Sequence, residues 1–158
     1  MKKIVLHCVV VLAALSFIFI SRPSTANTGE IQWKGYDEGV AMAKAEKKKI
    51  FLYFHADWCG YCRKMDASTF KDNDVVDYLN ENYITIKVNS DKEQKIASIY
   101  GVRGLPTSWF LKSSSEKLSS MPGYVDAGRL LTILKYVKTE SYEKMNYRDF
   151  EKSLNSAE

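Results

Sequence analysis

The most constraining feature of this sequence is a short apolar run that leads almost directly into a pair of cysteines. Residues 50–54 read Ile-Phe-Leu-Tyr-Phe. Such a short, continuous run is typical of a strand buried on both faces in a parallel or mixed sheet. Residues 58–62 read Trp-Cys-Gly-Tyr-Cys, and a helix is expected to begin at Cys59. The sequence therefore predicts a buried strand that brings two cysteines to the first turn of a helix.

The rest of the chain alternates between strand and helix patterns. The predicted strands cover residues 50–54, 83–88, 107–111 and 117–121. The predicted helices cover residues 36–48, 59–69, 73–79, 91–100 and 127–138. This order predicts an α/β sandwich, in which helices cover both faces of a central sheet.

Helix ends and a C-terminal helix complete this outline. Helix N-termini can be capped by Asn73 or Asp74, by Asp91 and by Asp126, and Gly101 suits the position after a helix end. Beyond residue 138, a charged tail contains apolar residues at a spacing that predicts a final amphipathic helix packed on the domain, namely Tyr142, Met145, Phe150 and Leu154.

The first 26 residues have the organisation of a secretory signal peptide. Lys2 and Lys3 precede an apolar stretch over residues 4–20, and small residues at 24–26 place a cleavage site after Ala26. The alternative is an uncleaved anchor, because about 17 apolar residues lie at the lower limit for spanning a bilayer. Both interpretations predict an exported protein, in a compartment where disulfides persist. The predicted organisation is a signal peptide (1–26), one domain (27–138) and a helical extension (139–158).

Charge and histidine content exclude several classes of function. The chain has 23 basic residues, but Lys2, Lys3 and Arg22 lie in the predicted signal peptide, which leaves 20 against 19 acidic residues. Proteins that bind nucleic acid usually carry a clear excess of positive charge, which this domain lacks, so no nucleic-acid partner is expected. Removal of the signal peptide also removes Cys8 and leaves His55 as the sole histidine. Ser/His catalysis and multi-histidine metal sites are therefore nearly excluded.

The pair Cys59 and Cys62 admits three interpretations. A structural disulfide is the usual role of two cysteines in an exported protein, but so small a loop removes little entropy from the unfolded chain. A metal site could add His55, yet structural zinc takes four ligands, so transfer of a soft metal is the better metal-based alternative. A redox pair fits the placement best. A helix N-terminus favours the attacking thiolate of Cys59, and Cys62, one turn later, can resolve a mixed disulfide.

Two motifs resemble those of the thioredoxin superfamily. Residues 56–62, Ala-Asp-Trp-Cys-Gly-Tyr-Cys, are similar to its active-site motif, and residues 102–107, Val-Arg-Gly-Leu-Pro-Thr, contain its cis-proline signature. Gly-Tyr at 123–124 resembles the glycine turn that closes the domain, and the resemblance extends over residues 33–138. Within the superfamily, the chain looks most like the C-terminal periplasmic domain of the bacterial electron-transfer protein DsbD. The dipeptide between the cysteines instead resembles that of the periplasmic disulfide isomerase.

The resemblance implies a thioredoxin fold, with a central mixed sheet and helices on both faces, and no cofactor or metal besides the redox-active disulfide. It also implies that Trp58 and Tyr61 frame the cysteines. A cis peptide bond at Pro106 would leave Leu105 and Thr107 placed to hold a substrate peptide through its backbone. The extra C-terminal helical tail is absent from the minimal fold, and either covers apolar surface or contacts a partner.

The chain departs from the family pattern six residues before the first cysteine, where the family usually has a buried acid and this chain has Tyr53. Asp66, one turn after Cys62, is a candidate replacement as proton acceptor. Lys87 matches a lysine found near the usual acid, so Asp66 and Lys87 form a possible proton relay. The alternative for Asp66 is a position on a solvated helix face.

Three features favour a reductase over an oxidant or isomerase. The resemblance outside the dipeptide is to an electron-donating domain, Leu105 is apolar where the isomerase has threonine, and residues 27–35 leave no room for a dimerisation domain. We therefore predict a monomeric periplasmic thiol–disulfide oxidoreductase that reduces protein disulfides and receives electrons from a membrane donor. The alternatives are a disulfide oxidant or isomerase, and a thiol-based metal-transfer or partner-binding module.

Overall fold

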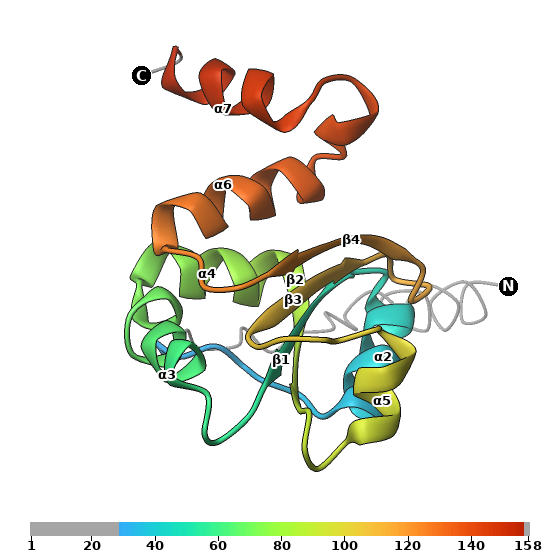
Figure 1. Ribbon diagram of the computed structural model, residues 1–158. Coiled ribbons are helices and arrows are strands. Elements are labelled where there is room, and N and C mark those ends of the chain that lie inside the picture. Colours follow the sequence, from blue (N-terminus) through green and yellow to red (C-terminus); the bar gives the residue numbers. More distant parts are fainter. Residues whose placement is uncertain (1–28, 157–158) are drawn as a thin grey trace, which may run out of the picture.

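The computed structural model describes residues 29–156 as a mixed four-stranded sheet with helices on both faces (Figure 1). The strand order is β2-β1-β3-β4, and β1 pairs parallel with β2 and antiparallel with β3, which in turn pairs antiparallel with β4. This arrangement confirms the predicted fold class. In chain order the elements are α2 (Tyr36–Glu46), β1 (Lys49–His55), α3 (Gly60–Ala67), the short 3-10 helix η1 (Thr69–Lys71), α4 (Asn73–Asn82), β2 (Tyr83–Asn89), α5 (Gln94–Ile99), β3 (Thr107–Leu111), β4 (Lys117–Pro122), α6 (Ala127–Lys138), the 3-10 helix η2 (Ser141–Glu143) and α7 (Tyr147–Asn155).

Strand β1 lies inside the sheet and contributes alternate side chains to two hydrophobic cores. Phe51 and Tyr53 belong to the core formed with α3, α4 and α6. Ile50, Leu52 and Phe54 belong to the core formed with α2 and α5, on the opposite face. All five side chains are fully buried. The alternation follows from the pleat of a strand, and it confirms that this apolar run is buried on both faces.

Helix α2 lies close against β2 because Gly39 has no side chain. A Cβ atom at this position would overlap the side chain of Ile86 in β2. The helix ends at Glu46, two residues before its predicted end, and Lys47 follows in the left-handed backbone conformation.

The observed caps agree with the predicted ones at two helix ends and differ at others. Asp126 caps α6 through its side chain, and Gly101 follows α5 in the left-handed conformation, as predicted. Helix α4 is capped by Asp72, so the prediction of Asn73 or Asp74 was wrong by one or two residues.

The predicted cap at Asp91 was also wrong, because α5 begins only at Gln94. The side chain of Asn89, at the end of β2, accepts the backbone amide of Asp91 at 3.1 Å and holds the following residues in a turn. The Asp91 carboxylate instead accepts a hydrogen bond from the Trp58 indole. Because of this polar turn, α5 begins three residues later than the predicted cap.

Residues 139–156, which we call the C-terminal extension, continue the chain past α6. Figure 1 shows α7 beyond α6, on the side away from the sheet. The predicted C-terminal helix is confirmed, and Phe150 is buried. Met145 is exposed, contrary to its predicted inward position, because it lies in the loop before α7.

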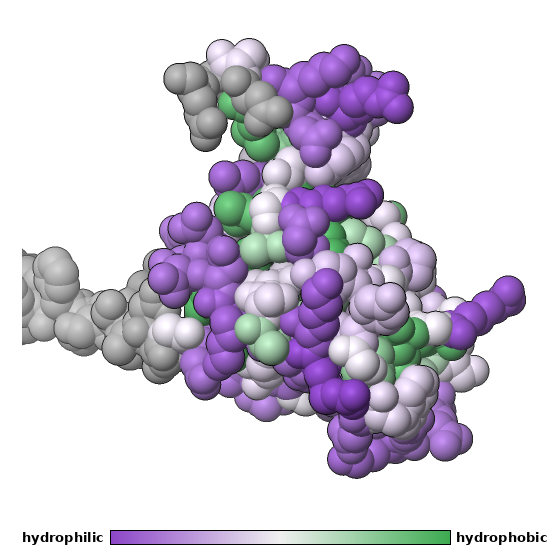
Figure 2. Space-filling model, turned by 60° about the vertical axis from the view of Figure 1, so that its left-hand side comes forward, coloured by the Kyte–Doolittle hydropathy of each residue, from purple (hydrophilic) through white to green (hydrophobic). Residues whose placement is uncertain are grey.

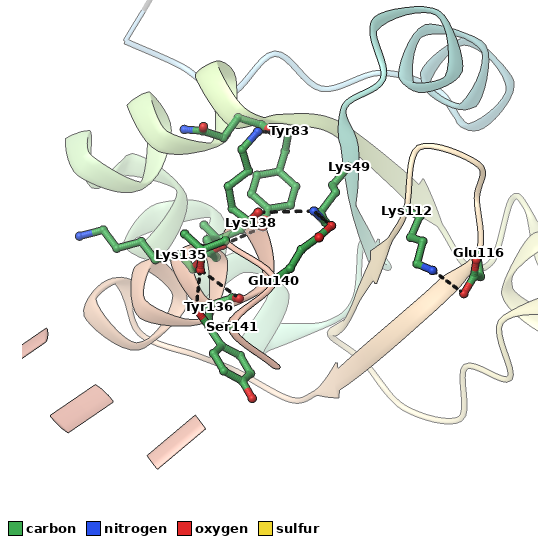
Figure 3. A network of polar contacts seen from close by, with 12 residues as sticks. Lys49, Tyr83, Lys112, Glu116, Lys135, Tyr136, Lys138, Glu140 and Ser141 are labelled. Atoms are coloured by element: carbon green, nitrogen blue, oxygen red, sulfur yellow. Dashed lines mark hydrogen bonds and ion pairs between the residues drawn. The ribbon is translucent and has the colours of Figure 1, made fainter. Parts of the chain in front are cut away.

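The start of the C-terminal extension is tied to the sheet by polar contacts (Figure 3). The Lys49 ammonium, at the beginning of β1, lies 2.7 Å from a Glu140 carboxylate oxygen and donates to the Lys138 carbonyl at 3.4 Å. The buried Tyr83 hydroxyl of β2 donates to the Leu134 carbonyl of α6 at 2.7 Å. These contacts fix the point at which the extension leaves the domain.

Hydrophilic residues cover much of the face in Figure 2, including the C-terminal extension, and hydrophobic residues emerge between them in small groups. Among residues 29–156, no helix is long and apolar enough to cross a membrane. The predicted signal peptide, residues 1–26, lies outside the described residues.

Candidate functional site

Two cysteines at the N-terminus of α3 form a disulfide. Cys59 is the N-cap residue of α3, and its sulfur accepts the backbone amide of Cys62 at 3.1 Å. Cys59 is 4% exposed and Cys62 is 1% exposed, so both residues are buried and Cys62 is the more buried of the two. Helix N-termini stabilise negative charge, and the reduced Cys59 therefore lies where a thiolate is favoured.

The loop between β1 and α3 is held by polar contacts around Asp57. Asn89, at the end of the neighbouring strand β2, donates its side-chain amide to the Asp57 carboxylate at 3.0 Å. The Arg63 guanidinium donates to the Asp57 carbonyl at 2.9 Å, and the Cys59 amide donates to the Ala56 carbonyl at 3.1 Å. These bonds position Cys59 before the helix begins.

Trp58 and Tyr61 are exposed around the cysteines, although large aromatic side chains are usually at least partly buried. Trp58 is 67% exposed and Tyr61 is 64% exposed. The Trp58 indole donates to the Asp91 carboxylate at 2.8 Å, which fixes the ring despite its exposure. The ring centroids of Tyr61 and Tyr124 lie 6.4 Å apart. Two oriented aromatic faces are thus available to a partner beside the disulfide.

The loop before β3 lies next to the end of β1. The Leu105–Pro106 peptide bond is cis, and Thr107 pairs with Phe54, the residue before the last of β1. The Thr107 hydroxyl donates to the Gly104 carbonyl at 2.7 Å, and the Pro106 carbonyl accepts an amide from the turn after β4 at 2.7 Å. Among residues 29–156, Leu105 lies outside every strand and enters none of the turn and loop backbone hydrogen bonds.

A polar cluster lies on the α3 face of the sheet, behind the cysteines. The Lys87 ammonium of β2 lies 2.7 Å from the carboxylate of Asp66 in α3. It also lies 5.6 Å from the ring centroids of Tyr53 and Trp33. The Tyr53 hydroxyl is buried and has no hydrogen-bond partner among the described residues. Burial, and then the charge of Asp66, raises the pKa of Tyr53 well above its usual range, so Tyr53 stays protonated.

This cluster is open to solvent through a cavity of about 310 Å³. Trp33, Asp66, Phe70 and Lys87 are among its lining residues. Because Asp66 follows Cys62 by one helical turn, the two side chains lie on the same helix face. The structure brings Asp66 and Lys87 together and gives the pair access to water.

His55 lies at the end of β1, with its ring stacked on Tyr53 at a centroid distance of 6.1 Å. Burial, and then the charge of Lys87, lowers the pKa of His55. Within residues 29–156, no group of three or more His, Cys, Asp or Glu side chains could hold a metal ion.

The sequence did not reveal the residues that support the site. Asp57 and Asn89 were assigned no role, and Asp91 was interpreted as a helix cap. None of the three has a distinctive spacing along the chain. The parallel pairing of β1 and β2 was the available signal, because it places the C-terminal ends of both strands, and the residues after them, side by side.

Comparison with known proteins identifies the family. Residues 36–138 match the model of the thioredoxin-like domain family. The chain is 31% identical over 93 residues to the thiol:disulfide interchange protein DsbD of Photorhabdus laumondii, an alignment that covers 56% of this chain and 16% of that protein. The chain spans between 14% and 56% of the length of the first three curated relatives.

Solved structures share this architecture. A thioredoxin from Thermus thermophilus superposes with a TM-score of 0.63 and 29% identity, over 68% of this chain and 87% of that one. The C-terminal domain of Neisseria meningitidis DsbD in the reduced form has a TM-score of 0.55 and 22% identity, over 63% of this chain and 90% of that one, a likeness of fold. The resemblance found in the sequence is thereby confirmed. The chain belongs to the thioredoxin-like domain family and carries a Cys59–Cys62 disulfide at the start of its α3 helix.

Proposed function

We propose that this protein is a periplasmic thiol–disulfide oxidoreductase that reduces disulfides in protein substrates. The observation that carries the proposal is the position of Cys59 as N-cap of α3, with Cys62 buried one turn behind it. The reactive sulfur is thus placed where a thiolate is stabilised, and its partner is placed for an intramolecular attack.

The two cysteines have distinct catalytic roles. The Cys59 thiolate attacks one sulfur of a substrate disulfide, which forms a mixed disulfide and releases the other substrate sulfur as a thiolate. The Cys62 thiolate then attacks the Cys59 sulfur, which restores the Cys59–Cys62 disulfide and releases the second substrate sulfur as a thiolate. Two electrons pass to the substrate, and its two thiolates take up protons.

The substrate binds across the exposed aromatic rings and the cis-proline loop. Trp58 and Tyr61 supply the aromatic contact, and their exposure leaves them free for it. Leu105 has a backbone available to pair with an extended peptide, while Pro106 and Thr107 fix the conformation of the loop.

Asp66 and Lys87 act as a proton relay for Cys62. Cys62 must lose its proton to attack and must regain one when the protein is reduced again. Asp66 lies one turn after Cys62 and is paired with Lys87 at 2.7 Å, beside a cavity that admits water. The pair therefore serves as the proton acceptor for Cys62, a role that the family usually gives to a buried acid at the position of Tyr53.

The proposed location and partners follow from the leader and from the relatives. An exported reductase needs a source of electrons, and the similarity to DsbD supports a membrane donor of the periplasmic thiol-reducing pathway. Residues 1–26 serve as a signal peptide cleaved after Ala26 or, alternatively, as a membrane anchor. The protein acts as a monomer.

The reduction potential of the purified protein, measured against glutathione, tests the direction. We expect a value near or below about −230 mV, in the range of thioredoxin-like reductases. A value near about −130 mV would show that the protein is a disulfide oxidant or isomerase and not a reductase. We also expect Cys59→Ser to abolish insulin reduction and Cys62→Ser to accumulate mixed disulfides. The absence of a reversible couple would overturn thiol exchange itself.

A further inference from the structure

A second candidate binding site lies where the C-terminal extension meets the edge of the sheet. A cavity of about 450 Å³ is bounded by Leu118 and Met121 of β4, by Ile133 of α6, and by Tyr142 and Tyr147 of the extension. Its size is within the range of small-molecule and side-chain binding pockets, and its walls are largely apolar.

The C-terminal extension builds one wall of this cavity and is held in place there. The family match ends at residue 138, so the wall is formed by a segment outside it. The Tyr136 hydroxyl of α6 donates to the Met145 carbonyl at 2.7 Å. The Tyr136 ring also contacts Tyr147 and Tyr142 edge to face, at centroid distances of 5.8 and 6.3 Å. The wall is therefore an ordered part of the molecule.

The cavity adjoins an unpaired strand edge. Strand β4 pairs only with β3 among the described residues, and its four central residues, Leu118 to Met121, line the cavity. Lysine on an edge strand commonly blocks pairing. Lys117 is turned away, because its ammonium donates to the Ile99 carbonyl at 2.7 Å and lies over the rings of Tyr100 and Trp109. The cavity side of the edge is left open to an extended segment.

Among residues 29–156, Arg129 is the only charged residue that lines the cavity. Its guanidinium makes no ion pair or side-chain hydrogen bond within the described part of the chain. An apolar cavity with one unpaired cation at its wall is complementary to an apolar group next to a carboxylate.

We propose that β4 and this cavity form a docking site for an extended segment of a partner protein. The segment pairs with the free edge of β4, inserts an aromatic or branched apolar side chain into the cavity, and places an acidic side chain against Arg129. Alternate residues of an extended peptide point to the same face, so this pattern requires the two side chains at a spacing of two. The docking site does not depend on thiol exchange.

The test uses the full oxidised protein and a phage-displayed library of random octapeptides without cysteine, so that no disulfide can form with the bait. We expect enrichment of peptides that combine an aromatic or branched apolar residue with Asp or Glu two positions away. An enriched peptide, synthesised and titrated into ¹⁵N-labelled protein, should shift the amide resonances of Leu118 to Met121.

Two variants and a matched control connect this binding to the cavity. Arg129→Gln removes the cation, and Tyr142→Ala removes part of the cavity wall. Each substitution should lower the affinity for the peptide by about 10-fold, as expected for the loss of one charged hydrogen bond or one aromatic contact. Arg148→Gln makes the same charge change on α7, outside the cavity, and should leave the affinity unchanged.

Three results would overturn the docking site. The first is failure of the library to enrich any peptide over a bait-free selection. The second is an enriched peptide whose affinity is the same in the Arg129 and Tyr142 variants as in the unmodified protein. The third is displacement of the peptide by dodecanoate with shifts confined to the cavity walls and none along the backbone of β4, which would assign the cavity to a small amphiphile. Insulin reduction is measured separately, so failure of docking and failure of thiol exchange are distinguishable.

Discussion

The two faces of strand β1 differ in chemistry although alternate residues of the same strand form them. On the α2 and α5 face, Ile50, Leu52 and Phe54 pack in an apolar core. On the α3, α4 and α6 face, the buried hydroxyl of Tyr53 has no hydrogen-bond partner among the described residues. It lies close to charged groups, and Tyr53 belongs to the same core as both cysteines. The first face supplies stability through packing, whereas the second places reactive groups.

The difference shows that one strand can serve stability and chemistry through separate side chains. Because neighbouring residues point to opposite faces, a substitution on one face leaves the groups on the other in place. Substitutions on either face test this separation.

The largest effect is expected from Leu52→Ala. Leu52 is fully buried in the apolar core, so its truncation leaves a cavity and should reduce the free energy of unfolding by about 2–5 kcal/mol. The reduction potential should stay the same, since the cysteines lie on the other face. Urea unfolding of the oxidised protein and a glutathione titration measure the two quantities. A changed potential with unchanged stability would contradict the separation.

A smaller effect, confined to kinetics, is expected from Asp66→Asn and Lys87→Met. Each removes one member of the proposed relay and should slow the release of substrate from the mixed disulfide on the order of 10²-fold at neutral pH. Single-turnover kinetics over a range of pH measure this step.

The matched control for the relay is Lys71→Met. Lys71 forms an ion pair of the same length, 2.7 Å, with Glu30 at the surface. We expect the control to keep the rate and pH profile of the unmodified protein. Equal slowing in the control, or an unchanged pH profile in both relay variants, would remove Asp66 and Lys87 from the mechanism.

The smallest effect concerns His55, at the end of β1. Burial, and then Lys87, lowers the pKa of His55 in the folded protein, whereas the unfolded chain titrates near a pKa of about 6.5. The unfolded state therefore binds this proton more readily, and the contribution of His55 to stability is lost as the pH falls below about 6.5. His55→Phe keeps a ring to stack on Tyr53 and should show a weaker loss of stability between about pH 6.5 and 5. Urea unfolding at several pH values gives the comparison, and identical slopes for both proteins would refute it.

The strands and α6 were predictable because their signals are local. Alternation along 83–88 and continuous apolarity along 50–54 depend only on neighbouring residues. The depth at which α2 packs was not predictable, since it depends on Gly39 meeting Ile86, 47 positions later. The ion pair of Lys49 with Glu140 joins residues 91 positions apart. Contacts at such separations leave no periodic signal.

The same distinction applies to the candidate site. The two cysteines were recognised through a compact motif. Asp66 became a candidate through its position one helical turn after Cys62, and Lys87 through a family resemblance. The bond between Trp58 and Asp91 spans 33 positions and was missed. The sequence also could not predict that the buried Tyr53 hydroxyl lacks a hydrogen-bond partner among the described residues. This property depends on all the side chains that surround the hydroxyl in the fold.

The alternation along β1 also limits how this chain can change in length. Deleting or inserting one residue within 50–54 would shift the pairing with both β2 and β3 by one position and exchange the two faces. Tyr53 would then enter the apolar core, and a neighbour from that core, Leu52 or Phe54, would take its position behind the cysteines. Substitutions in this segment act one side chain at a time, but a length change would act on all of them together. Tolerated insertions and deletions therefore belong to the loops and the chain ends, as the C-terminal extension illustrates.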